Sequence, residues 1–372
     1  MKQDKTINAF FALVKAGLWE VSDVNLNIND YVDWEKVYRL AEEQSVIGVV
    51  LAGIEHSKVK PSQEFLLQWI GEVQILEQQN KEMNQFIADL IDKLRKADIY
   101  TLLLKGQGVA QCYERPLWRS CGDVDLFLND TSYKYTKELL KPFATSVEPE
   151  GIKGKHLAMT IDSWVVELHG TLYGGISGRI NKMMDELQND VFYGGIARSW
   201  LNGKTQVFLP GADIDAVYVF THFLNHFYKG GLGLRQICDW CRLMWTYKDS
   251  LDHGLLVSRI KKAGLMTEWK AFGAFAVDYL GMPKEAMPFY SADVKWKKKA
   301  NKICDFILEV GNMGHKRDMS YFNDKSYLMQ KVISMGRRWG DLRRHAKIFP
   351  LDSVKFFPRI ILYGLLSAVR GE

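Results

Sequence analysis

The sequence lacks any apolar run long enough to span a membrane, and it has no apolar leader at its start. The longest candidate, residues 356–369, is short and is interrupted by Pro358 and Arg359, so we expect a last core helix there. Five cysteines, an odd number, indicate reduced thiols rather than a disulfide framework. These absences predict a cytoplasmic protein without a transmembrane segment.

Two common catalytic motifs are also missing. The sequence contains no Gly-x₄-Gly-Lys-Ser/Thr loop and no Gly-x-Ser-x-Gly elbow, which argues against a P-loop ATPase or an α/β-hydrolase. The net charge of +5 and the pI near 8.7 suit a polyanionic ligand such as a nucleoside triphosphate. That charge is too weak and too dispersed to favour duplex nucleic acid as a partner.

The hydrophobic period changes twice along the 372 residues. Residues 1–98 show helical spacing, residues 99–209 contain the strand-like segments, and helical spacing returns after Pro210. We therefore predict three regions with these bounds: an N-terminal helical region, a small α/β core and a C-terminal helical domain at 210–372. The expected fold class is α+β, with a small mixed sheet flanked by helices. Further helices are predicted at 254–264, 268–280, 293–311, 325–345 and 354–369.

Four segments of the core have the composition of strands. They are residues 99–104, 123–128, 156–161 and 164–169, and the last two form a hairpin with a tight turn at Asp162-Ser163. Short helices are expected at 109–113 and 131–141. No further strand is predicted in the chain.

Two acidic residues in the second strand are the first sign of chemistry. Asp123 and Asp125 stand at i and i+2, so their side chains share one face of the strand while Val124 points into the core. Paired carboxylates are costly without a cation, and their oxygens suit Mg²⁺ or Mn²⁺. In the absence of metal, we expect replacement of either Asp by Ala to leave the melting temperature equal or higher. Glu167 lies within an apolar strand, where an acidic residue is expensive unless it faces a site.

The order of three motifs resembles a bacterial family classed as uncharacterised nucleotidyltransferases, within the DNA polymerase β-like superfamily. The motifs are Leu-Leu-Lys-Gly at 103–106, Arg-x-x-Gly-Asp-x-Asp-Leu at 119–126, and an apolar-Glu-Leu-His strand at 166–169. The resemblance extends from Gly17-Leu18-Trp19 to Leu234-Arg235-x-x-x-Asp239. Two departures concern the turn: Gln107 stands where the superfamily has Gly or Ser, and the fifteen residues before Asp123 make a long spacer.

The resemblance implies catalytic and metal-binding roles for Asp123, Asp125 and Glu167, with the two aspartates bridging two metal ions and Glu167 completing the site that activates the attacking hydroxyl. It implies transfer of a nucleoside monophosphate, for instance from ATP, to an acceptor that stays open: a small molecule, a peptide, a protein side chain or an RNA end. The predicted nucleotide-binding residues are Lys105, Gly106, Gln107, Arg119 and Gly122. A glycine lets the backbone approach phosphates, and the cations balance their charge. The alternatives are a solvated lysine for Lys105 and a salt bridge to a nearby carboxylate for Arg119.

Three further residues are candidates for a supporting role. His169 lies two residues after Glu167, on the same strand face, and is either a partner of the site or a satisfied core histidine. Arg235 and Asp239 are one helical turn apart, which favours an ion pair between them and leaves substrate positioning as the alternative.

A second set of potential metal ligands occurs in the C-terminal region. His222 and His226, followed by Cys238 and Cys241, have spacings that resemble a reversed zinc finger. Both pairs lie in apolar helical patterns, so we expect buried thiols, and histidines that pack or form hydrogen bonds near the α/β core.

Two other classes of protein remain compatible with the Asp-x-Asp motif. One is a nucleotide-sugar glycosyltransferase, although that class normally shows repeated βαβ units. The other is a catalytically inactive binding module with the same fold, although three retained carboxylates argue against decay.

Overall fold

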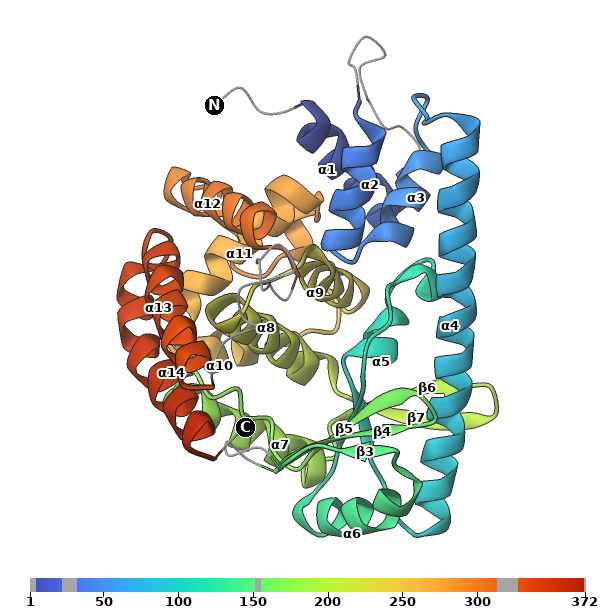
Figure 1. The fold of residues 1–372 in the computed structure, drawn as a ribbon, viewed down its shortest axis with the longest axis vertical. Helices are drawn as coiled ribbons and strands as arrows, with labels where there is room; N and C mark the ends of the chain where they lie inside the picture. Colours follow the sequence, from blue (N-terminus) through green and yellow to red (C-terminus); the bar gives the residue numbers. More distant parts are fainter. Residues whose placement is uncertain (1–4, 22–31, 151–154, 313–326, 371–372) are drawn as a thin grey trace.

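A computed structural model describes residues 5–21, 32–150, 155–312 and 327–370. One mixed sheet of seven strands lies among helices that come from both ends of the chain (Figure 1). The predicted fold class, a mixed sheet flanked by N-terminal and C-terminal helices, is confirmed.

The N-terminal helices are α1 (Lys5–Trp19), α2 (Trp34–Glu43), α3 (Ile47–Glu55) and α4 (Gln63–Lys96). The first and third cross closely, because Gly17 has no side chain: a Cβ there would lie 1.8 Å from the carbonyl oxygen of Val49. Helix α4 has 34 residues, and Ser62 caps its start by accepting from the amide of Phe65. At 1.5 Å per residue it is about 50 Å long, and it runs along one whole side of the molecule (Figure 1).

The strands are β1 (Leu102–Leu104), β2 (Val124–Phe127), β3 (Ser146–Val147), β4 (His156–Ile161), β5 (Trp164–His169), β6 (Ala197–Asn202) and β7 (Thr205–Pro210). Their order in the sheet is β3-β4-β5-β2-β1-β7-β6. The pairs β2–β5 and β1–β7 are parallel, and the other pairs are antiparallel. The predicted strands β1, β2 and β5 lie next to one another in the sheet, and the predicted hairpin of β4 and β5 turns at Asp162-Ser163, both with positive φ.

Strand alternation gives the sheet two different faces. Val124, Leu126 and Leu168 belong to a hydrophobic cluster that also contains the C-terminal half of α4 and part of α6 (Asp130–Leu140). The opposite face carries Asp125 and Glu167, and it is turned toward the C-terminal helices. The sheet therefore separates an apolar core from a polar site.

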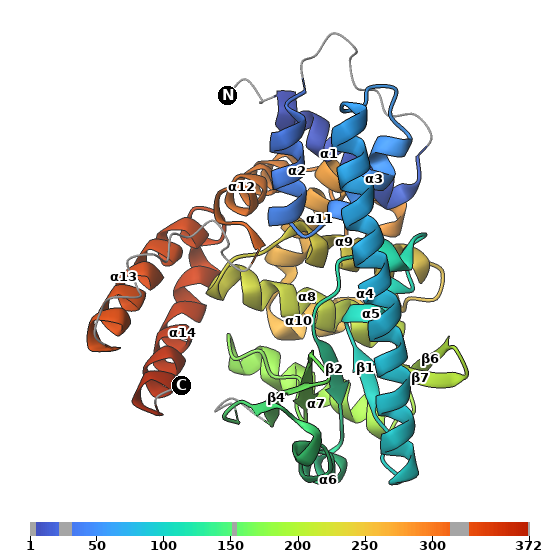
Figure 2. The same ribbon diagram turned by 45° about the vertical axis from the view of Figure 1, so that its right-hand side comes forward.

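The C-terminal helices are α8 (Ala212–Lys229), α9 (Leu234–Thr246), α10 (His253–Ala263), α11 (Met266–Leu280), α12 (Val294–Val310), α13 (Tyr327–Ala346) and α14 (Pro350–Arg370). They share one core with the N-terminal helices: the indole of Trp19 donates to the carbonyl oxygen of Leu280 over 2.6 Å. Helices α13 and α14 lie side by side at the edge of the molecule (Figures 1 and 2). The predicted domain boundaries stay a prediction.

The sheet and the last helix each differ in part from the prediction. The sheet is larger than predicted, because the hairpin of β6 and β7 extends it beyond β1, and helix α7 (Gly178–Phe192) precedes that hairpin. The last helix contributes Phe356 and Ile360 to the core, as expected for residues 356–369, but it also exposes Leu351 and Leu362. Among the described helices, none combines the length and apolar character needed to cross a membrane.

Candidate active site

Three carboxylates converge on the polar face of the sheet. Parallel pairing of β2 with β5 places Asp125 directly beside Glu167, and Asp123 precedes Asp125 by two residues on the same face. Ligand oxygens of the three residues all lie within 4.8 Å of one another, as one or two cations require. Asp125 is only 1% exposed, and its Oδ2 accepts no hydrogen bond within the described part of the chain. Such an oxygen is costly to bury unless an ion or ligand completes it.

Lys105 supplies a positive charge to this cluster. It follows β1 directly, with a positive φ of 48°, and its Nζ lies 2.9 Å from Oδ1 of Asp125. Burial alone would lower the pKa of Lys105, but the charges of Asp125 and Asp123 outweigh burial and raise that pKa. The lysine is therefore cationic and paired, not a solvated strand-end residue. Gly106, which follows with φ 43°, begins α5 (Gly106–Ala110).

Two histidines contact the carboxylates directly. His169 Nε2 lies 2.8 Å from Asp125 Oδ1 and 3.4 Å from Glu167 Oε2, and His156 Nε2 lies 3.1 Å from Glu167 Oε2. Burial would lower the pKa of His169, but its bonds to both carboxylates raise it. Burial would likewise raise the pKa of Glu167, but bonds from both histidines hold it well below its usual range. His169 is thus a direct partner of the site and not an isolated core histidine.

The pKa of Asp125 is raised, chiefly by burial and then by the charge of Asp123, while Lys105 opposes the shift. The main cause is therefore loss of solvent rather than the clustering of like charges on which the sequence argument rested.

A cavity of about 640 Å³ opens beside the carboxylates. Its size is in the range of pockets that hold small molecules and cofactors. Its walls come from the site face of the sheet, the segment after β5, and helices α5, α7, α8, α9, α13 and α14. Its cationic lining residues, besides Arg119, are Lys105, Lys229, Arg235 and Arg338.

Helix α8 contributes a polar stripe that sequence analysis recognised only in part. Tyr218, His222, Asn225, His226 and Lys229 follow one another at helical spacing and line the cavity. The intervening residues are buried and, apart from Thr221, mostly apolar, so the polar positions of this amphipathic pattern were a usable signal.

The two histidines of that stripe continue a chain of polar contacts from the carboxylates. His222 Nε2 lies 3.4 Å from Lys105 Nζ and 2.9 Å from His226 Nε2. Burial and the charge of Lys105 lower the pKa of both, that of His226 to about 4, so both are neutral at pH 7. The expectation that they form hydrogen bonds near the α/β core is confirmed. Cys238 and Cys241 are buried in the helical core, outside the groups of potential metal ligands found among the described residues.

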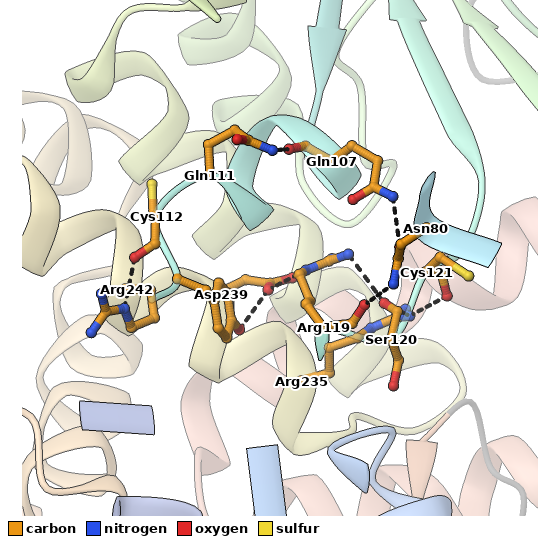
Figure 3. Close-up of polar contacts among 11 residues, drawn as sticks. Asn80, Gln107, Gln111, Cys112, Arg119, Ser120, Cys121, Arg235, Asp239 and Arg242 are labelled. Atoms are coloured by element: carbon orange, nitrogen blue, oxygen red, sulfur yellow. Dashed lines mark hydrogen bonds and ion pairs between the residues drawn. The ribbon is translucent and has the colours of Figure 1, made fainter. Parts of the chain in front are cut away.

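Arg119 is held by a buried ion pair next to the site (Figure 3). Arg119 forms a two-fold ion pair with Asp239, with both N···O distances 2.7 Å, and Tyr113 donates to the same carboxylate. The salt-bridge alternative for Arg119 is therefore present in the structure, while its role in nucleotide binding stays a prediction; the residue also lines the cavity.

Arg235, expected to pair with Asp239 along the helix, instead donates to the carbonyl oxygens of Ser120 and Cys121 (Figure 3). Burial lowers the pKa of Arg235, which nevertheless stays a cation, and its Nε has no hydrogen-bond partner within the described residues. It lines the cavity beside Gly122 and Asp123.

Gln107 is the predicted site residue whose side chain turns away from the cavity. Its Nε2 donates to Asn80 Oδ1 over 2.6 Å, and Asn80 in turn donates to the carbonyl oxygens of Leu117 and Arg119 (Figure 3). This buried network ties the loop before β2 to helix α4. The Gln107 side chain is thus a structural anchor, and the part of this turn in nucleotide binding stays a prediction.

Comparison with known proteins gives a family but little else. Residues 30–281 match the family described as uncharacterised nucleotidyltransferase, and no curated protein matches the chain. A similar solved structure is that of an antigenic nucleotidyltransferase-like protein from Paracoccidioides brasiliensis, at 15% sequence identity; the similarity covers 50% of this chain and 91% of that one, with a TM-score of 0.29. The family match runs from α2 to α11 and includes the whole sheet, and the chain therefore belongs to this family of uncharacterised nucleotidyltransferases.

Proposed function

We propose that this protein is a metal-dependent nucleotidyltransferase of the DNA polymerase β-like kind. It would transfer a nucleoside monophosphate from a triphosphate to a hydroxyl or similar acceptor and release pyrophosphate. The observation that carries the proposal is the convergence of Asp123, Asp125 and Glu167 on one face of the sheet, beside a cavity with cationic walls.

The carboxylates fit Mg²⁺ or Mn²⁺. They offer hard oxygen ligands within 4.8 Å of one another, and Asp125 Oδ2 is buried without a hydrogen bond from the described residues. Asp123, Asp125 and Glu167 would hold the metal, which supplies charge neutralisation for the attacking and leaving oxygens of an in-line displacement.

The remaining residues would bind and orient the substrate. Lys105 and Arg235 line the cavity on the side of the carboxylates and are placed to neutralise phosphate oxygens. His169 holds Asp125 and Glu167 in position through bonds of 2.8 and 3.4 Å. The polar stripe of α8 forms another wall of the cavity, where the base or the acceptor would be oriented.

The topology gives no support to the glycosyltransferase alternative. In the described sheet, only β2–β5 and β1–β7 are parallel pairs, unlike the repeated βαβ units of that class. A catalytically inactive module would have the same topology as the active enzyme. Activity measurements therefore distinguish the two.

The test combines binding with product analysis. We expect one or more of the nucleoside triphosphates, with Mg²⁺ or Mn²⁺, to raise the melting temperature and to yield pyrophosphate when an acceptor library is supplied. Asp123→Asn should abolish both effects, whereas Asp249→Asn, at a solvent-exposed position that does not line the cavity, should change neither. Binding of a UDP-sugar alone would contradict the proposal. Absence of binding and of pyrophosphate release with every nucleotide would favour the inactive module.

A further inference from the structure

A second group of metal-ligand atoms lies beside the carboxylates. His156 on β4 pairs directly with His169 on β5, and Glu167 precedes His169 by two residues, so all three side chains share one face. The two imidazole rings have centroids 4.8 Å apart. One ligand atom from each of these residues lies within 4.8 Å of the others.

The distances between these ligand atoms match those between neighbouring ligands of a bound metal ion. Both histidines present Nε2 to the same oxygen, Glu167 Oε2, at 3.1 Å from His156 and 3.4 Å from His169. A metal with bonds of about 2.0–2.2 Å to nitrogen and oxygen holds neighbouring ligand atoms roughly 3–3.5 Å apart. An ion can therefore replace the shared protons with small movements of the side chains. His156 has 42% of its side chain exposed and lines the cavity, which leaves a path for entry.

We propose that His156, Glu167 and His169 form a second cation site, adjoining the three carboxylates, for a transition-metal ion such as Zn²⁺. The ion would replace the proton that His169 Nε2 shares with Asp125 Oδ1 at 2.8 Å. Two imidazole nitrogens and one carboxylate favour such an ion over Mg²⁺, which prefers oxygen ligands. Glu167 is shared: its Oε2 faces the histidines, which leaves Oε1 for an ion held by Asp123 and Asp125. The inference goes beyond nucleotidyl transfer, because it concerns an ion that Asp123 does not touch and that needs no nucleotide.

The experiment uses the full chain and Co²⁺ as a spectroscopic substitute for Zn²⁺. Co²⁺ should produce visible absorption bands typical of nitrogen coordination at one equivalent, and Zn²⁺ should displace it. His156→Gln should weaken Co²⁺ binding by more than the roughly 10–100-fold that loss of an outer-shell partner costs. His253→Gln, on the exposed surface of α10, is the matched control and should leave binding unchanged.

Asp123→Asn separates this proposal from the proposed function. It should lose the stabilisation by nucleotide with Mg²⁺ but retain the Co²⁺ bands. Because the His156 side chain is partly exposed, its substitution tests the site even where His169→Gln fails to fold. The proposal is overturned if Co²⁺ gives no bands with the unmodified protein, or if His156→Gln binds Co²⁺ as tightly as the original chain; either result leaves the nucleotide assay unaffected.

Discussion

Asp125→Asn should destabilise the metal-free protein, whereas Asp123→Asn should not. Asp125 is 1% exposed and contacts both Lys105 Nζ at 2.9 Å and His169 Nε2 at 2.8 Å. The asparagine has nearly the same shape, so the change removes charge without opening a cavity. It leaves the cation of Lys105, whose side chain is only 13% exposed, without its nearest partner.

The expected magnitude follows from these contacts. Removing one partner of a buried ion pair costs about 3–5 kcal/mol. Relief of repulsion from Asp123 and Glu167 offsets part of that, so we expect a loss of roughly 2–4 kcal/mol in the free energy of unfolding. Asp123 is partly exposed and shares only in the more distant field of Lys105, so its change should lie within about 0.5 kcal/mol of zero or be stabilising. The sequence alone had predicted no loss for either residue.

The assay is urea unfolding in EDTA, followed by tryptophan fluorescence, for both single variants and for Lys105→Met/Asp125→Asn. The double variant should regain stability relative to Asp125→Asn, because neither charge is then left alone. Equal stability of Asp125→Asn and the original chain would refute the argument that this ion pair stabilises the fold. An equal loss of unfolding free energy in Asp123→Asn and Asp125→Asn would show that burial and the contact with Lys105 do not set the effect of each carboxylate on stability.

Three further predictions concern other parts of the molecule. Arg235→Met should raise the Kd for nucleoside triphosphate about tenfold or more in calorimetry, with partial recovery in Arg235→Lys, since the cation lines the cavity; an unchanged Kd would remove it from the site. Burial, assisted by Asp352, raises the pKa of Glu268 to about 8. Between about pH 4.5 and 8 the folded protein holds a proton on Glu268 that the unfolded chain releases, so the free energy of unfolding should fall as the pH rises through this range. Glu268→Gln should flatten that part of a pH series of melting temperatures, and a parallel pair of curves would contradict the assignment. Gly17→Ala should lower the free energy of unfolding by several kcal/mol in a denaturant titration, because its Cβ would meet backbone at 1.8 Å; a near-neutral result would show that α1 can shift freely.

Local pattern was sufficient for most elements of the α/β core. Strands β4 and β5 have the predicted bounds of residues 156–161 and 164–169, because their alternation is strong and the turn between them is tight. The hairpin of β6 and β7 was missed, since β6 is an edge strand without a single buried residue and so carries no apolar alternation. It is held by backbone pairing with β7, which side-chain periodicity does not report.

The partners of charged residues were harder to predict. Asp239 has Arg235 one turn before it, yet it pairs with Arg119, which is 120 residues away in the chain. Helical spacing identifies which side chains can meet, but burial decides which do, because Arg119 is held inside the protein by the Asn80 network and must be neutralised there.

The sequence by itself determined that Asp123 and Asp125 share one face of a strand, because side chains alternate along a strand with a period of two. Only the tertiary structure decided that β2 and β5 are neighbours in parallel register, which aligns Asp125 with Glu167. It also decided that Lys105 and the two histidines of the β4–β5 hairpin contact those carboxylates. Such contacts depend on strand order and on the packing of distant helices, and no local period in the sequence encodes either.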